Sequence, residues 1–299
     1  MSEQSVAEGR AAAPGGDRGR GGPRKRTPRV AEVVRTERIT PHMIRVVLGG
    51  DGLAGFPVGE FTDHYVKLLF APAGAGYSAP FDVEQIEAEL PRELWPVTRT
   101  YTVRAWDATA GELTIDFVHH GDEGLAGPWA AAARPGDVIQ LLGPGGAYAP
   151  APEADWHLLA GDESALPAIA ATLEALPAGA RALVFVEVTG PAEEQGDLAV
   201  RPGVELVWLH RGTAAPGAAL VATVTGQRLP EGRGHVFVHG EAAAVRDLRR
   251  HLRAERGLDP ALTSISGYWR SGDTEDRWQA AKREWNAAIE AEDAATTAS

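Results

Sequence analysis

The sequence contains no cysteine among its 299 residues. Cysteine thiolates hold iron–sulfur clusters, form disulfides, bind many structural zinc ions and act as nucleophiles, so these roles are excluded. No apolar run approaches the roughly 18 residues that span a bilayer, and no apolar signal-peptide segment follows Met1. If the protein moves electrons, a bound organic cofactor must carry them, and we expect a cytoplasmic protein without membrane insertion.

Positive charge is outnumbered, since 29 Lys or Arg face 41 Asp or Glu and the formal net charge is −12. This balance argues against a nucleic-acid partner. Residues 1–29 hold seven Lys or Arg and three acids, whereas the remainder holds 22 and 38. A segment so rich in Gly, Arg and Pro cannot bury a core, and we expect residues 1–28 to form a disordered basic tail.

Residues 29–148 read as a first domain of short strands separated by Gly and Pro turns. Such strands at regular spacing favour a small antiparallel β-barrel. One helix is expected over 125–133, since Pro128 falls in its first turn, where its missing N–H costs nothing. The predicted strands are Val30–Arg38, Met43–Gly49, His64–Phe70, Thr98–Ala105 and Glu112–His119.

Residues 149–299 change to an alternation of strands and helices, which favours a parallel sheet covered by helices. Ligands of such sheets bind beyond the carboxyl ends of the strands. The run Gly143–Gly146 does not by itself predict a phosphate loop, because a turn that links the domains is at least as good an interpretation. The predicted strands are Trp156–Ala160, Arg181–Thr189, Val204–His210 and His235–His239, and the predicted helices are Leu166–Ala175, Ala214–Val224 and Ala242–Arg256.

A C-terminal helix is predicted over 273–294, where Trp278 and Trp285 are seven residues apart. That spacing returns to the same side of a helix. We expect both indoles to dock on the body of the protein, with an oligomer contact as the alternative.

The run from Arg99 to Arg104 places a cation, an aromatic ring and hydroxyls in one β-favouring segment. Side chains alternate along a strand, so Arg99 and Tyr101 share a face. Arg offers a fork of donors suited to a pyrophosphate, and Tyr offers a ring face for a flavin. The hydroxyl or backbone N–H of Thr102 could reach a flavin nitrogen.

Further motifs follow in a characteristic order: Asp116–Gly124, Pro135–Asp137, Gly143–Gly146, Gly161–Ile169 and Gly267–Arg270. With these motifs the sequence resembles the siderophore-interacting protein family over residues 29–285. The members of that family are FAD-dependent ferric-siderophore reductases of the ferredoxin-reductase superfamily. The resemblance implies an FAD-binding antiparallel barrel followed by an α/β nucleotide-binding domain, with NADH or NADPH as electron donor and a ferric siderophore as substrate.

The same resemblance implies roles for individual residues. Arg99 would hold the FAD pyrophosphate, Tyr101 and Thr102 would contact the flavin ring, and two basic residues would grip an anionic ferric chelate. The other implied residues are Val118 and His120 on the ribityl and phosphate path, Gly124, Ala126, Gly127 and Trp129 in the loop that closes on the pyrophosphate, Gly161, Asp162 and Ser164 beside the nicotinamide, and Lys67 and Arg270 at the chelate.

Several alternatives stay open. The protein could reduce a partner protein or free flavin, or it could hold ferric siderophores without being their reductase, and reduced ferredoxin could replace the nicotinamide. Arg270 could instead stack on Trp269 or pair with Asp273 or Glu275. An acid near the end of the second strand often reads the ribose of NAD, and an Arg accepts the phosphate of NADP, which makes Glu187 and Arg211 the candidates here.

No protein metal site is predicted. His119 and His120 are adjacent, so in a strand they face opposite sides. The iron would belong to the chelator of the substrate. A monomer is favoured.

Overall fold

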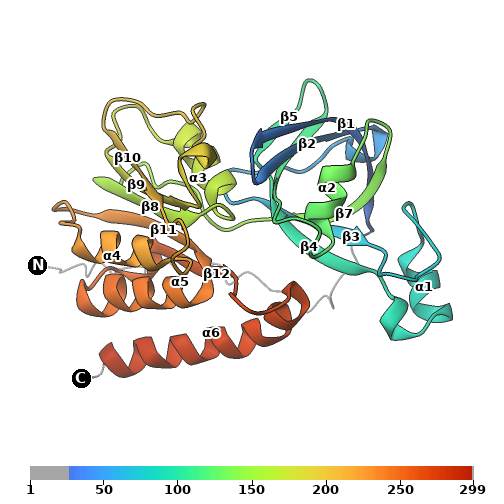
Figure 1. The fold of residues 1–299 in the computed structure, drawn as a ribbon. Coiled ribbons are helices and arrows are strands. Elements are labelled where there is room, and N and C mark those ends of the chain that lie inside the picture. The colour runs from blue at the N-terminus through green and yellow to red at the C-terminus, as the bar shows by residue number, and fades with distance from the viewer. Residues whose placement is uncertain (1–26, 298–299) are drawn as a thin grey trace, which may run out of the picture.

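The computed structural model describes residues 27–297, so the tail predicted for 1–28 lies outside it except for its last two residues. The chain forms two β-sheets side by side, each with its own helices (Figure 1). None of the helices in the described part of the chain is long and apolar enough to cross a membrane.

The first sheet has seven antiparallel strands in the order β4-β3-β7-β1-β2-β6-β5, as expected for the N-terminal part. Apolar side chains from these strands fill one core, which also takes up Ala126 and Ala130 of helix α2. Helix α1 protrudes on the side away from the second sheet (Figure 1). The elements are β1 (Arg29–Thr40), β2 (Met43–Gly49), β3 (Tyr65–Phe70), α1 (Val83–Glu89), β4 (Val97–Thr102), β5 (Ala105–Asp107), β6 (Glu112–Val118), α2 (Ala126–Ala132) and β7 (Val138–Gly145).

The strand predicted over Thr98–Ala105 is wrong in one respect, because β4 ends at Thr102 and β5 begins at Ala105. The reason is a change of hydrogen-bond partner between the two. Val103 N donates to His64 O beside β3 at 2.7 Å, whereas Arg104 N donates to Thr114 O in β6 at 2.9 Å. The chain therefore crosses from one edge of the sheet to the other over two residues, and this crossing links the two edges of the barrel.

Residues 143–145 belong to β7, so their interpretation as part of an interdomain turn is wrong. Gly145 pairs with Tyr65 of β3. A Cβ added at Gly145 would lie 2.4 Å from Cζ of Tyr65. Glycine is needed here because the tyrosine ring lies directly against the backbone of β7.

The second sheet has five parallel strands in the order β10-β9-β8-β11-β12, as predicted for an α/β fold. Alternate residues face opposite layers: Leu159 packs with α3, whereas Leu158 packs with α4 and α5. Strand β12 was not predicted. The elements are β8 (Trp156–Asp162), α3 (Leu166–Ala175), β9 (Ala182–Val188), β10 (Val204–His210), α4 (Ala218–Gly226), β11 (Gly234–Glu241), α5 (Ala242–Arg249), a π-helical turn (Arg250–Glu255), β12 (Thr263–Trp269) and α6 (Glu275–Thr297).

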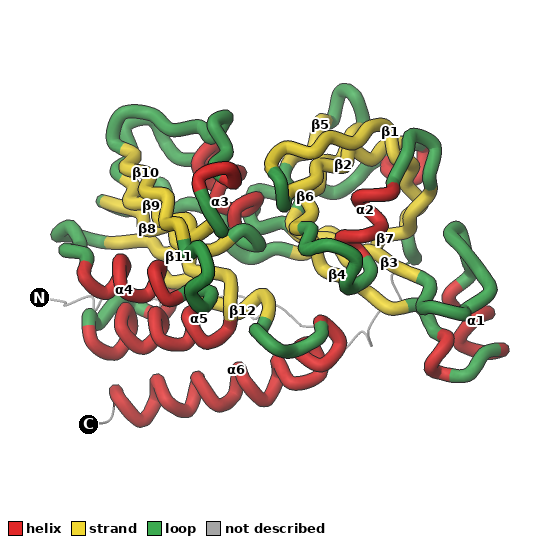
Figure 2. Tube along the Cα trace, in the orientation of Figure 1, coloured by secondary structure: helices red, strands yellow, loops and turns green. Residues whose placement is uncertain are grey.

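Helix α6 runs alongside α5, and its first turn lies near the barrel (Figure 2). Trp278 is 1% exposed, and its Nε1 donates to Tyr268 O in β12 at 2.8 Å. The ring of Trp285 lies 5.3 Å from that of Trp278 and packs on the core under α4 and α5. The predicted docking of both indoles on the body is confirmed.

Side chains hold the two sheets together at the boundary between them. Glu193, which follows β9, accepts hydrogen bonds from the Thr40 hydroxyl at 2.6 Å and from the His42 backbone N–H at 3.1 Å. The hydroxyls of Thr62 and Thr172 are 2.8 Å apart and share a hydrogen bond. These contacts fix how the carboxyl edge of the parallel sheet faces the barrel.

Candidate functional site

A cavity of about 190 Å³ opens beside β4 and collects many of the residues that the sequence singled out. It lies where the end of β6, the loop before α2 and the first turn of α6 meet. Two acids that the sequence reasoning had not placed in the site, Glu123 and Glu275, also line it. The predicted residues that line it are Arg99, Tyr101, Val118, His120, Gly124, Ala126 and Gly127.

The two main predicted flavin contacts, Arg99 and Tyr101, face the same side of β4. Their partners on β3 are Leu68 and Val66, both fully buried. The Tyr101 ring lies 4.4 Å from that of Phe117, and burial raises the pKa of its phenol. Tyr101 is therefore a neutral ring in a fixed position.

Thr102 and Trp129 lie outside the cavity lining. Thr102 is buried on the opposite face of β4, and its side chain hydrogen-bonds with Tyr268 of β12. The Trp129 ring lies 5.6 Å from that of Phe117 and packs on the barrel core. Both residues thus support the walls of the site.

His120 stands between the cavity and the second sheet. Its ring is 6.1 Å from that of His42, which Glu193 binds through its backbone N–H. Burial lowers the pKa of His120, while the charge of Glu163 acts in the opposite direction. The phosphate path predicted for His120 therefore adjoins acids of the second sheet.

Asp162 lies at the carboxyl end of β8, where the nicotinamide was predicted to approach. Its carboxylate accepts from Ser164 N and Oγ at 2.9 and 2.5 Å, from Glu241 N at 2.8 Å, and from Trp269 Nε1 at 2.8 Å. Burial nevertheless raises the pKa of Asp162 to about 6. Asp162 thus ties together the carboxyl ends of three neighbouring strands, β8, β11 and β12.

Gly161 precedes this group and leaves no room for a side chain. A Cβ there would lie 2.6 Å from His239 O and 2.6 Å from the Cβ of Ala165. The backbone of β8 therefore packs directly against β11 and the start of α3 at the predicted nicotinamide side.

Glu187 and Arg211, the candidates for nucleotide discrimination, are both engaged within the protein. Glu187 is fully buried and accepts from Gly217 N and Leu220 N at the start of α4. This position rules out direct reading of a ribose by Glu187, because its carboxylate is enclosed. Arg211 donates to Glu163 at 2.8 Å and to the Thr189 hydroxyl at 2.9 Å.

Buried histidines predict loss of stability in mild acid. Burial lowers the pKa of His157 to about 4 and that of His239 to about 3, whereas histidine in the unfolded chain titrates near 6.5. Below about pH 6.5 the unfolded state binds protons that the folded state does not, so each group costs about 1.4 kcal/mol per pH unit. Asp162, whose raised pKa favours folding in acid, offsets part of this loss below about pH 6.

We therefore expect the free energy of unfolding in urea to be about 2–3 kcal/mol lower at pH 5 than at pH 7. His157→Leu should reduce that difference, because it removes one of the titrating groups. The substitution breaks no hydrogen bond of Nδ1, which has no partner among the described residues. An unchanged pH dependence in this variant would contradict the assignment.

Lys67 lies on the outer face of β3, opposite Thr100 of β4 and away from Tyr101. Lys282 of α6 is close enough for the charge of Lys67 to lower its pKa, although burial lowers it more. Its Nζ lies 5.9 Å from the centre of the Trp278 ring. The two lysines thus lie close enough to interact between β3 and α6, and the nearby Glu275 carboxylate acts on the pKa of Lys282 in the opposite direction.

Arg270 is half-exposed, and its Nε is 3.8 Å from Asp273 Oδ2. Of the alternatives for Arg270, the structure thus favours this long ion pair, since the cation–π contacts among the described residues involve Arg29 and Lys282 and not Arg270. At 3.8 Å the pair leaves donors of the guanidinium available.

Lys282 and Glu275 were missed by the sequence reasoning, although a signal existed. Together with the two tryptophans they recur at intervals of three, four and three residues, which places all four on one face of a helix. The body-facing tryptophans therefore mark these two charged residues as body-facing too.

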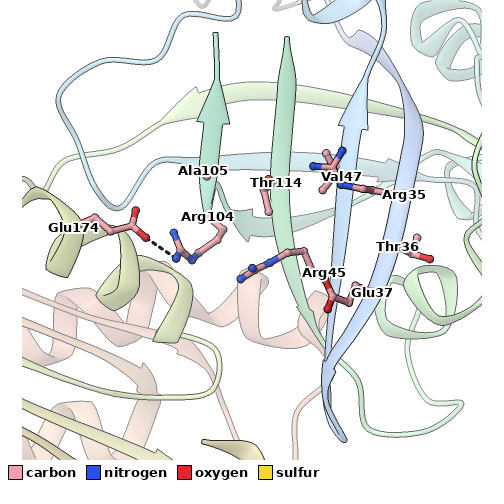
Figure 3. A pocket seen from close by; sticks show the side chains of 9 residues that line it. All are labelled: Arg35, Thr36, Glu37, Arg45, Val47, Arg104, Ala105, Thr114 and Glu174. Carbon is pink, nitrogen blue, oxygen red and sulfur yellow. Dashed lines mark hydrogen bonds and ion pairs between the residues drawn. The ribbon is translucent and has the colours of Figure 1, made fainter. Parts of the chain in front are cut away.

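A second cavity, of about 390 Å³, lies on the other side of the barrel and contains none of the predicted residues. In Figure 3 the guanidinium group of Arg104 points toward Glu174, while Arg45 extends from the neighbouring part of the lining. Arg45 is paired with Asp116 at 2.7 Å, and Arg104 is paired with Glu174 of α3 at 2.7 Å. Its charges are thus compensated within the protein. Among the described residues no group of three or more His, Asp or Glu could hold a metal ion.

Comparison with known proteins gives two family matches. Residues 32–148 match the siderophore-interacting FAD-binding domain, and residues 154–272 match the siderophore-interacting protein family. An uncharacterized protein of Mycobacterium tuberculosis is 49% identical, over 85% of this chain and 94% of its own length.

Named relatives and a solved structure agree with these matches. The ferric vibriobactin reductase ViuB of Vibrio cholerae is 34% identical over 84% of this chain and 92% of its own. The NADPH-dependent ferric-chelate reductase of Escherichia coli is 34% identical over 79% and 91%. The crystal structure of a siderophore utilization protein from T. fusca is 42% identical, with a TM-score of 0.71 over 83% of this chain and 94% of that one.

Proposed function

This chain belongs to the siderophore-interacting protein family, and on that premise we propose that it reduces ferric siderophores in the cytoplasm with electrons from NADH or NADPH, passed through FAD. Reduction releases iron because Fe(II) binds the hard oxygen donors of a chelator far less tightly than Fe(III). The relatives from V. cholerae and E. coli, whose names are those of ferric reductases, support the reaction class.

The residues of the smaller cavity fit FAD. A cation, a fixed aromatic ring and a glycine-rich loop meet there, since Arg99, Tyr101, Gly124 and Gly127 share one lining. Bound FAD would supply the conversion of a two-electron donor into one-electron steps. Arg99 would bind the pyrophosphate, and Tyr101, held by Phe117, would support the ring system.

On the predicted nicotinamide side, the residues of this chain would serve to position the donor and not to react with it. The absence of a side chain at Gly161 allows close packing at the carboxyl edge of β8, and Asp162 ties Ser164 and Trp269 together there. Neither residue would need to transfer a proton, because the bound cofactors would themselves supply the hydride chemistry. Residues 29–148 would then be the FAD domain and 149–299 the domain for NADH or NADPH.

The observation that carries the substrate assignment is a set of cations on β3, on α6 and on the loop that precedes α6. Lys67 and Lys282 lie close enough to interact, and Arg270 is half-exposed on that loop. Many ferric siderophores are anions, and the net charge of −12 repels anions at long range. Screening limits that repulsion to about 8 Å in physiological salt. Local cations must therefore provide recognition.

The test is the visible spectrum of the purified protein under anaerobic conditions. We expect flavin absorbance that bleaches with NADH or NADPH and returns when a ferric siderophore is added. A flavin band that neither nicotinamide bleaches would indicate another donor, such as reduced ferredoxin, or a binding role. Absence of any flavin band would contradict the proposal at its centre.

A further inference from the structure

Asp276 in the first turn of α6 grips Arg99 with both carboxylate oxygens. Nη1 of Arg99 donates to Oδ1 at 2.7 Å, and Nη2 donates to Oδ2 at 3.0 Å. Nη1 also donates to Thr98 O at 2.9 Å. The Arg99 side chain is 12% exposed, so these bonds hold its guanidinium plane at the edge of the cavity.

A guanidinium carries five N–H donors in a fixed planar fork, and these contacts use three of them. The two left over are the Nε–H and the second N–H of Nη2, which lie side by side and are nearly parallel. Such a pair binds two oxygens of a phosphate at once. No acceptor within residues 27–292 bonds to the Nε of Arg99.

We propose that Asp276 is a positioning residue of the FAD site, which orients Arg99 so that its remaining fork faces the pyrophosphate. This inference rests on the proposed function. The geometry makes α6 part of the cofactor site, although it begins 176 residues after Arg99. FAD retention then depends on the docking of α6 through Trp278.

Glu275, the residue before Asp276, also carries a carboxyl group and serves as the comparison for Asp276. It lines the cavity itself, and burial raises the pKa of its carboxyl. A carboxylate inside the cavity repels a pyrophosphate, whereas the carboxylate of Asp276 lies behind the guanidinium. Two neighbouring acids should therefore have opposite effects on FAD affinity.

The experiment compares Asp276→Asn, Glu275→Gln and, as a control on the exposed face of α6, Glu284→Gln in the full chain. FAD dissociation on dilution of the holoprotein is followed by the rise in flavin fluorescence. We expect Asp276→Asn to raise the Kd for FAD about tenfold, because an amide offers only one acceptor to the fork. Glu275→Gln should lower the Kd about twofold, and the control should leave it unchanged.

Two readouts separate positioning from general support of the fold. Asp276→Glu should restore most of the affinity, and Asp276→Asn should have no further effect in an Arg99→Lys background, because an ammonium has no planar fork. An unchanged or lower Kd in Asp276→Asn would overturn the inference. So would equal weakening in Glu275→Gln, whereas failure of the unaltered protein to bind FAD would overturn the proposed function itself.

Discussion

Arg99→Ala is expected to weaken FAD binding by about 100-fold, since it removes two charge-assisted hydrogen bonds to the pyrophosphate. The variant also frees the carboxylate of Asp276, which then adds negative charge beside the phosphates. Both effects act in the same direction. The measurement is the Kd for FAD, together with the flavin content of the protein as purified.

The matched control is Arg92→Ala, which removes an exposed arginine from the same half of the chain. It should purify with the flavin content of the unaltered protein. Full flavin occupancy in Arg99→Ala would contradict the assignment of Arg99 to the pyrophosphate. The melting temperature of the flavin-free forms tells loss of affinity from loss of folding.

Lys67→Ala combined with Arg270→Ala is expected to raise the KM for anionic ferric chelates by about 30-fold and that for neutral chelates by less than about threefold. The reason is that these cations act on the charge of the chelate and not on the flavin. Steady-state reduction of a trianionic and a neutral ferric chelate gives both values. The value of kcat for the neutral chelate should change little.

Arg283→Ala serves as the control, because it removes an exposed cation of α6 without touching the pair of Lys67 and Lys282. Equal increases in KM for charged and neutral chelates would refute charge recognition. Adding Lys282→Ala should raise the KM for anionic chelates further, because Lys282 lies close enough to Lys67 to interact with it and belongs to the same group of cations.

The sequence was sufficient for the parts of the fold that local patterns encode. Strand alternation placed Arg99 and Tyr101 on one face, and they line one cavity. The seven-residue spacing of Trp278 and Trp285 placed both on the body-facing side of α6. Strand β7 was not among the predicted strands, because its last residues are Gly-Pro-Gly, a composition typical of turns.

Contacts between distant segments could not be predicted, because an ion pair between them leaves no local pattern. Asp276 and Arg99 lie 177 residues apart, and nothing in either neighbourhood indicates the other. Glu187 shows the reverse difficulty, since its position at a strand end suggested ribose recognition. The structure instead uses its carboxylate to satisfy backbone N–H groups at the start of α4.

The crossing of the chain from β4 to β5 has a consequence for how this sequence can diverge. Arg99 faces the smaller cavity, while Arg104, five residues later, is bonded to Glu174 of α3. Between them lie only the last three residues of β4 and Val103, the first of the two crossing residues. A single insertion or deletion would turn one arginine away from its partner, so among descendants of this gene we expect substitutions in this stretch but no change in its length.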